Sequence, residues 1–139
     1  IGDRSRLDKS LIKLMGELEL LTIANDNLHL TIALNYGGRD EILRATKKIS
    51  EKVKLGVLSI DDITVEMFSN NLDTFDLPDP DLVIRTSGEV RTSNFLPWQC
   101  AYSEYVFEKT NWPDFNNDIY EEILIEFKNR ERRFGAILK

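Results

Sequence analysis

Leucine spacing near the start of the chain predicts the first helix. From Arg6 onward, apolar residues recur three and four positions apart, a spacing that places them on one face of an α-helix. They are Leu7, Leu11, Leu14, Leu18 and Leu21. Lys13 and Glu17 lie one turn apart on the polar side. The helix is expected to end at the Asn-Asp-Asn turn of residues 25–27.

The next segments alternate between strand and helix patterns. Residues 28–35 read LHLTIALN, a short run rich in apolar and β-branched residues that predicts a strand ending before Tyr36. A second helix is expected where Ile42, Ala45, Ile49 and Val53 repeat with helical spacing. A short third helix is expected over residues 61–70, with Ser59 and Asp62 forming a capping box.

The second half of the chain continues the alternation. Residues 72–81 contain two prolines and predict a loop, and residues 82–84 read as a buried strand. Residues 105–107 form a plausible last strand, and a final helix is expected over residues 117–133. This order predicts an α/β fold, a mainly parallel sheet flanked by helices, in a single domain spanning residues 1–139.

Composition narrows the classes of function. The apolar share of 42% and charged share of 30% are typical of globular chains and exclude a disordered one. The net charge of −6 argues against binding of nucleic acid. One cysteine, Cys100, excludes a disulfide framework and a multi-cysteine zinc site. With no bilayer-length apolar run and no secretory leader, we expect a cytoplasmic protein.

Charged and hydroxyl side chains are concentrated directly after the buried strand. Residues 85–95 hold two arginines, four hydroxyl side chains and one carboxylate. Ligands of parallel α/β sheets bind beyond the carboxyl ends of strands, and guanidinium forks suit phosphate oxygens. The alternative is a structural loop in which Arg85 and Arg91 pair with Glu89 and Asp79. We favour a diphosphate site, because guanidinium groups together with hydroxyls suit a diphosphate better than a sugar or a base edge.

Two further candidates stay open at this level. Gly37 and Gly38 allow a tight turn that places Arg39 at a helix start, a region that favours anions. The commoner alternative is that these glycines only make the turn and that Arg39 pairs with a surface carboxylate. Glu104 lies among aromatic residues and either faces solvent or binds a hard cation. The P-loop, GxGxxG, HExxH and CxxC motifs are absent from the sequence.

Several ordered motifs, taken together, resemble one family over almost the whole chain. They are NYGGR at 35–39, DLVIRTSGE at 81–89, Arg91 with SNFL at 93–96, Trp98-Gln99, Ala101-Tyr102, Glu104, WPDF at 112–115 and RERRFG at 130–135. In these residues the sequence resembles the cis-prenyltransferases, and among them the bacterial undecaprenyl diphosphate synthases.

The resemblance implies an activity, a metal and partners. Members of the family condense isopentenyl diphosphate with an allylic diphosphate such as farnesyl diphosphate, form a cis double bond at each step and require magnesium. They work as homodimers, enclose the growing chain in a hydrophobic tunnel between sheet and helices, and deliver a lipid product to the membrane. The protein would therefore be cytoplasmic and meet the membrane through its substrate and product.

The resemblance also implies roles for individual residues. Those expected to grip the diphosphate of isopentenyl diphosphate are Arg85, Arg91 and Ser93. Glu89 and Asn94 would support that loop, and Glu104 would help to hold magnesium. The residues expected to reach across the dimer interface are Arg133, Phe134 and Gly135.

One family motif, Asp-Gly-Asn-x-Arg-Trp, is not found in the sequence. Its aspartate organises magnesium and the allylic diphosphate in the family, so we expect the catalytic aspartate to lie upstream of Ile1. The chain would then be the C-terminal portion of an enzyme, inactive alone, with the apolar face of its first helix exposed. The alternative is a non-catalytic subunit that supports a partner prenyltransferase. The presence of Arg85, Arg91, Ser93 and Glu104 favours the enzyme.

Overall fold

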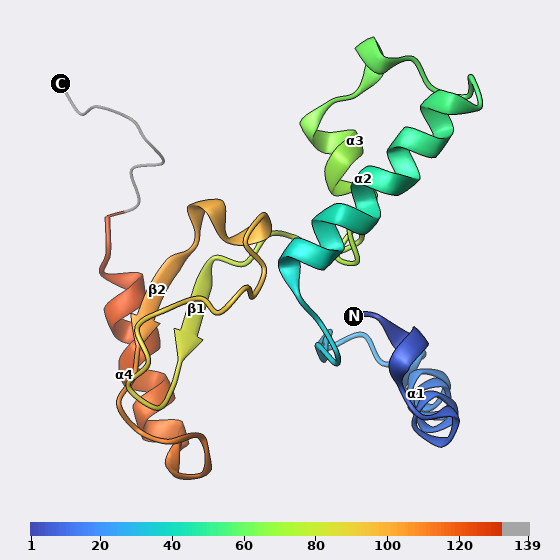
Figure 1. Ribbon diagram of the computed structural model, residues 1–139. Coiled ribbons are helices and arrows are strands. Elements are labelled where there is room, and N and C mark those ends of the chain that lie inside the picture. The colour runs from blue at the N-terminus through green and yellow to red at the C-terminus, as the bar shows by residue number, and fades with distance from the viewer. Residues whose placement is uncertain (132–139) are drawn as a thin grey trace, which may run out of the picture. The chain divides into compact units, whose positions relative to one another are not determined.

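The computed structural model describes residues 1–131, and their contacts group the chain into two compact units (Figure 1). One unit runs from Ile1 to Leu77 and the other starts at Pro78. The single domain of residues 1–139 stays a prediction.

The first helix, α1, spans Lys9–Thr22. It begins later than the leucine pattern because the Asp8 carboxylate accepts a hydrogen bond from the Ser10 amide at 2.8 Å and caps the helix, while Arg4–Arg6 form a separate 3-10 turn. The predicted Lys13–Glu17 pair is present at 3.6 Å.

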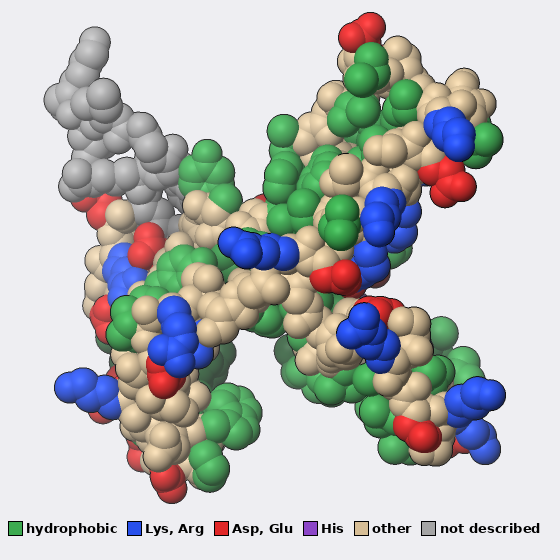
Figure 2. All heavy atoms as spheres, in the orientation of Figure 1, with side chains coloured by type: hydrophobic (Ala, Val, Ile, Leu, Met, Phe, Trp, Pro, Cys, Tyr) green, Lys and Arg blue, Asp and Glu red, His purple; other side chains and the backbone are tan. Residues whose placement is uncertain are grey.

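The leucine face of α1 lies at the surface of its unit. Leu14 is 61% exposed, Leu18 51% and Leu21 80%, and none of the helix's residues is buried. Figure 2 shows hydrophobic side chains at the surface over this helix. The expected exposure of this face is therefore confirmed.

The predicted strand over residues 28–35 is wrong as a β-strand. The segment is extended, and its backbone bonds only with the first residues of the chain. The Ile1 amino group donates to the Ile32 carbonyl at 2.9 Å, and the Leu34 amide donates to the Ile1 carbonyl at 3.0 Å. Alternating apolar residues predict an extended backbone, but a β-ladder also needs a partner strand, and this contact is too short to form one.

The second helix, α2, spans Gly38–Lys54 and confirms the prediction made from helical spacing. Its buried face carries Glu41, Ala45 and Ile49. The neighbouring helix α3, Val65–Ser69, contacts α2. The core of this unit therefore lies along one face of α2.

The predicted helix over residues 61–70 is corrected to two shorter elements. A 3-10 turn spans Ile60–Asp62, and the helix proper, α3, starts only at Val65. The Thr64 hydroxyl caps it by accepting a hydrogen bond from the Met67 amide at 3.1 Å. Ser59 caps only the 3-10 turn, at 3.3 Å from the Asp61 amide. Two capping residues close together thus interrupt one helical pattern.

The second unit contains the parallel strands β1, Leu82–Arg85, and β2, Glu104–Phe107. Leu82 pairs with Glu104, and Arg85 pairs with Phe107. Because side chains alternate along a strand, one face of this pair carries Val83, Arg85, Tyr105 and Phe107. The opposite face carries Leu82, Ile84, Glu104 and Val106. Both predicted strands are confirmed.

The last described helix, α4, spans Asn117–Lys128. The Asn116 side chain caps its start by accepting a hydrogen bond from the Ile119 amide at 3.1 Å. The helix was predicted to reach Arg133 but ends earlier, with Asn129 as its C-cap. Helices beside a parallel strand pair confirm the α/β class. Among residues 1–131, no helix is long and apolar enough to cross a membrane.

Candidate functional site

The loop after β1 is held against the chain that follows β2. The Glu108 amide donates to the Arg85 carbonyl at 2.7 Å, and the Gly88 amide donates to the Glu108 carbonyl at 2.9 Å. The Ser87 amide bonds to the Thr110 carbonyl at 2.8 Å. Backbone hydrogen bonds thus fix the start of this loop at the carboxyl end of the strand pair, where ligands of parallel sheets bind.

The same loop concentrates unusual backbone conformations. Positive φ angles occur at Ser87 (70°), Ser93 (48°), Asn94 (64°) and Leu96 (46°), and at Gly88 (68°). Each left-handed residue other than glycine costs on the order of 1–3 kcal/mol, and such residues cluster at ligand sites. Asn35 is the other described residue besides glycine with this feature. The distribution therefore supports the loop as the candidate site.

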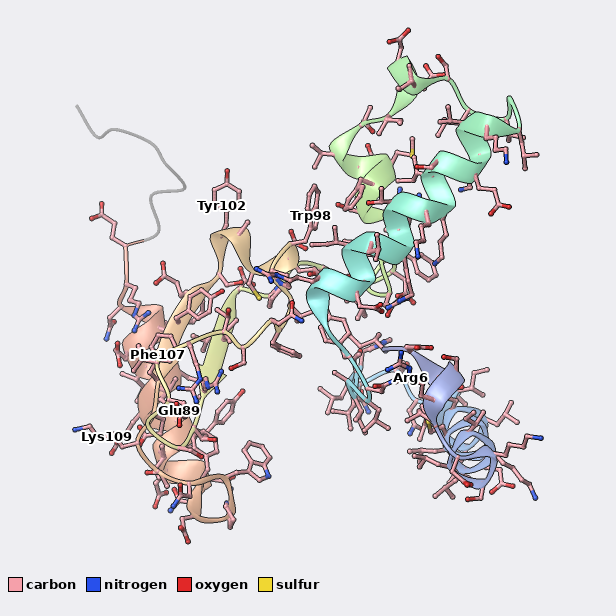
Figure 3. The ribbon with its side chains drawn as sticks, viewed as in Figure 1. Arg6, Glu89, Trp98, Tyr102, Phe107 and Lys109 are labelled. Carbon is pink, nitrogen blue, oxygen red and sulfur yellow. The ribbon has the colours of Figure 1, made fainter. Side chains whose placement is uncertain are left out.

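Arg85 and Arg91 meet in this loop, and each has an internal partner. The Nη1 group of Arg85 donates to the Ser93 hydroxyl oxygen at 2.9 Å and also to the Arg91 carbonyl. The Arg91 guanidinium forms an ion pair with the Glu89 carboxylate. Figure 3 shows Glu89 on the same side of the unit as Phe107 and Lys109. The sequence left open whether these two arginines pair with carboxylates. Arg91 pairs with Glu89, whereas Arg85 donates to oxygen atoms of the loop itself.

A pocket of about 260 Å³ opens between this loop and the strand pair. Arg85, Arg91, Thr92 and Ser93 supply its polar side. Its apolar side is formed by Val83, Ile84, Phe95, Tyr105 and Phe107. The rings of Tyr105 and Phe107 stack with centroids 5.9 Å apart and planes inclined by 15°. The pocket can therefore take a ligand with an anionic head and a short apolar body.

Glu104 lies apart from this pocket. It is at the amino end of β2, three residues and about 10 Å along the strand from the register position of Arg85, and on the opposite face. Its carboxylate accepts a hydrogen bond from the Arg130 guanidinium at 3.1 Å. The same guanidinium donates to the Tyr105 carbonyl at 3.0 Å and to Glu126. The hydrogen bond to Glu126 is the largest of the effects that raise the pKa of Arg130.

The described residues fit a magnesium ion only in part. Within residues 1–131, no group of three or more histidine, cysteine, aspartate or glutamate side chains is placed to hold a metal. Magnesium commonly takes one or two protein carboxylates together with substrate phosphates and water. Glu104 therefore fits the role of one ligand among others, and only once its ion pair with Arg130 loosens.

The remaining predicted residues lie elsewhere in the chain. Arg39 lies in the first turn of α2 and so belongs to the first unit, while Asn94 lies in the loop with its left-handed backbone. The predicted interface residues Arg133, Phe134 and Gly135 are outside the described residues.

Residue-by-residue reading of the sequence missed the apolar side of the pocket. Phe95, Tyr105 and Phe107 line it, but they carried no predicted role beyond strand or loop membership. The period-2 alternation of β2 was the available signal, because it places Tyr105 and Phe107 on one face. What the sequence left open was the pairing of that face with Arg85.

The fold and site define the class of α/β proteins whose ligand site follows the carboxyl ends of parallel strands. Comparison with known families is more specific. Residues 1–135 match the family described as "Putative undecaprenyl diphosphate synthase". The chain belongs to this family of isoprenyl transferases, as the motifs indicated.

Relatives and solved structures agree with this assignment. The chain is 52% identical over 137 residues to an isoprenyl transferase of Agrobacterium fabrum, covering 99% of this chain and 56% of the relative. It is 50% identical over 137 residues to an isoprenyl transferase of Bacillus subtilis, covering 99% of this chain and 53% of the relative. The chain thus spans about half the length of these curated relatives.

Two solved structures share the fold. Lavandulyl diphosphate synthase from Lavandula x intermedia, solved in complex with dimethylallyl diphosphate, matches with a TM-score of 0.94 and 39% identity, over 98% of this chain and 58% of that one. A probable undecaprenyl diphosphate synthase from Campylobacter jejuni matches with a TM-score of 0.85 and 39% identity, over 98% of this chain and 61% of that one. The predicted cis-prenyltransferase fold is confirmed.

Proposed function

We propose that this chain supplies the isopentenyl diphosphate site of a prenyltransferase that extends an allylic diphosphate, such as farnesyl diphosphate, to a cis-polyprenyl diphosphate such as undecaprenyl diphosphate. The observation that carries the proposal is the pocket after β1. It has arginine and hydroxyl donors on one side and stacked aromatic rings on the other. An isopentenyl diphosphate molecule has the same two parts, a doubly phosphorylated head and a short hydrocarbon body.

The pocket residues have two tasks in this reaction. Arg85, Arg91 and Ser93 hold the homoallylic diphosphate by charge-assisted hydrogen bonds, for which their donors are already gathered. Tyr105 and Phe107 direct the hydrocarbon body away from water, so that its double bond is presented to the allylic carbon. Neither task needs a covalent nucleophile from the protein, because the double bond of isopentenyl diphosphate forms the new bond to the allylic carbon as diphosphate leaves it, and a proton is then lost from the isopentenyl unit.

Magnesium is part of the proposal through Glu104. When bound, the ion would stabilise negative charge on the departing diphosphate. Glu104 is the described carboxylate that matches the family's metal motif, and we expect the other protein ligand, an aspartate, to lie outside this sequence. The chain alone is therefore proposed to be inactive.

Three further parts of the proposal follow from the family. The enzyme acts as a homodimer, with Arg133, Phe134 and Gly135 at the interface. It works in the cytoplasm and passes its lipid product to the membrane. Glu89 and Asn94 keep the loop in the shape that binds diphosphate. The ion pair of Glu89 with Arg91 and the left-handed backbone of Asn94 support this role.

Incorporation of labelled isopentenyl diphosphate tests the function directly. The 139-residue chain and the full-length gene product are each incubated with farnesyl diphosphate and magnesium. We expect polyprenyl product only from the full-length protein, and loss of that product with the double variant Arg85→Ala/Arg91→Ala. Robust turnover by the short chain would overturn its proposed inactivity. Undiminished turnover by the double variant would overturn the proposed role of the two arginines. No product from the full-length protein would instead favour the alternative of a non-catalytic supporting subunit.

A further inference from the structure

The loop after β1 contributes an aromatic ring to the apolar side of the pocket. Most of the apolar residues that line the pocket belong to the strand pair, namely Val83, Ile84, Tyr105 and Phe107. Among the described lining residues, Phe95 is the only apolar one that the loop supplies. Its side chain is 42% exposed, so the ring borders the pocket and does not belong to a closed core. This ring has no task in the reaction described so far.

The backbone is left-handed on both sides of Phe95. Asn94 has φ 64° and Leu96 has φ 46°. The Phe95 amide donates to the Thr92 carbonyl at 3.0 Å. The Cys100 amide donates to the Leu96 carbonyl at 2.9 Å, so hydrogen bonds hold the chain before and after the ring. Left-handed residues other than glycine cost free energy and persist where the surrounding structure enforces them. The loop therefore keeps Phe95 at the pocket in spite of this cost.

The sheet fixes the opposite part of the apolar side. Val83 pairs with Tyr105, and Arg85 pairs with Phe107, in the parallel ladder. Because the side chains of a paired strand stand on a fixed face of the sheet, these residues keep their places as long as the strands stay paired. Phe95 is therefore the apolar lining residue whose size can be changed without a change in the sheet.

The polar and apolar sides of the pocket lie close together along the loop. Ser93, whose hydroxyl oxygen accepts a hydrogen bond from Arg85, comes two residues before Phe95. Two residues span at most about 7 Å. The pocket volume of about 260 Å³ is also below the roughly 300–1,000 Å³ of pockets that take drug-sized ligands. A diphosphate held at Ser93 therefore leaves room for only a short hydrocarbon body.

We propose that Phe95 is a specificity-determining residue, whose ring closes the apolar side of the pocket and limits the homoallylic substrate to a five-carbon body. The inference rests on the proposed function, because such a limit matters only if the pocket binds isopentenyl diphosphate. The arginines and Ser93 hold the diphosphate head in this account, and the branched end of the body meets the Phe95 ring. An extra methylene at that end would displace either the head or the ring.

A homologue of isopentenyl diphosphate with one more methylene at the branched end, 3-ethylbut-3-enyl diphosphate, tests the proposal. The first condensation of each compound with farnesyl diphosphate is followed with the full-length gene product, and the ratio of the two kcat/KM values is measured. We expect the unaltered protein to prefer isopentenyl diphosphate by about 10- to 200-fold, the usual effect of one methylene in a hydrophobic pocket. Phe95→Ala should lower this preference about tenfold, because it opens the space that the methylene needs.

The ratio separates a limit on size from a loss of folding, because misfolded protein lowers both kcat/KM values equally. Phe95→Leu, a smaller change, should lower the preference in the same direction by a smaller factor. Val90→Ala shortens a 72% exposed side chain of the same loop that does not line the pocket, and should leave the ratio unchanged. An unchanged ratio in both Phe95 variants would overturn the proposal, and so would equal use of the two compounds by the unaltered protein.

Arg85→Ala keeps this failure distinct from failure of the proposed function. If Arg85→Ala lowers kcat/KM for isopentenyl diphosphate and the Phe95 variants keep the ratio, only the role of Phe95 fails. If Arg85→Ala leaves the kinetics unchanged, or the full-length protein forms no product, the proposed function fails and the role of Phe95 fails with it.

Discussion

Replacement of Arg85 by alanine is the sharpest test of the pocket after β1. In the structure, one guanidinium nitrogen donates to the Ser93 hydroxyl oxygen at 2.9 Å and to the Arg91 carbonyl, so the side chain is already held against the loop. A hydrogen bond to a charged group contributes about 1.5–3 kcal/mol. Since about 1.4 kcal/mol corresponds to a factor of ten, we expect a loss of about 10- to 100-fold in kcat/KM for isopentenyl diphosphate.

Steady-state kinetics of the full-length protein, with each substrate varied in turn, measure this effect. The loss should fall mainly on the KM for isopentenyl diphosphate, with a smaller effect on the allylic substrate, because the contact exists before the chemical step. Arg85→Lys should recover only part of the loss, since an ammonium group keeps the charge without the fork. Lys109→Ala, an exposed cation of the same unit, controls for net charge. Unchanged kinetics for both substrates with Arg85→Ala would refute the assignment.

Two further predictions concern stability. Gly88→Ala should lower the free energy of unfolding by about 1 kcal/mol, because Gly88 has φ +68°, although an added Cβ would meet no other atom within 4 Å. Gly16→Ala, in the interior of α1 with equally open surroundings, should raise the free energy of unfolding by about 0.5–1 kcal/mol. Urea unfolding of both variants measures these changes, which should have opposite signs. The Arg44 hydrogen bonds lower the pKa of Asp73, so the stability that its carboxylate adds is present above its ordinary value of 3.8 and is lost as pH falls below it. The difference in unfolding free energy between the unaltered chain and Asp73→Asn should shrink over that acidic range, and a difference independent of pH would contradict the linkage.

Local pattern was enough to predict several elements of the fold. Helix α2 and both strands appear where spacing and β-branched residues predict them. Helix boundaries were less accurate, because single capping side chains such as Asp8 and Thr64 decide where a helix starts. The loop chemistry of residues 85–95 was also readable, since forks and hydroxyls follow a strand directly in sequence.

Other features depend on residues far apart in the chain, and these required the three-dimensional structure. Residues 28–35 have a strand pattern, yet a ladder forms only where a partner strand lies alongside. The strand register decides that Glu104 is on the face opposite the pocket, where Arg130 pairs with it.

The burial of Glu41 also depends on residues that are distant in the sequence. Acidic residues favour the first turn of a helix because of the helix dipole, so Glu41 carried no predicted role in the core. It is buried because Tyr36 and the Asp73 amide, five and 32 residues away, both donate hydrogen bonds to it. The periodicity of one helix carries no information about hydrogen-bond donors in other segments of the chain. Only the tertiary structure therefore shows that this carboxylate is buried.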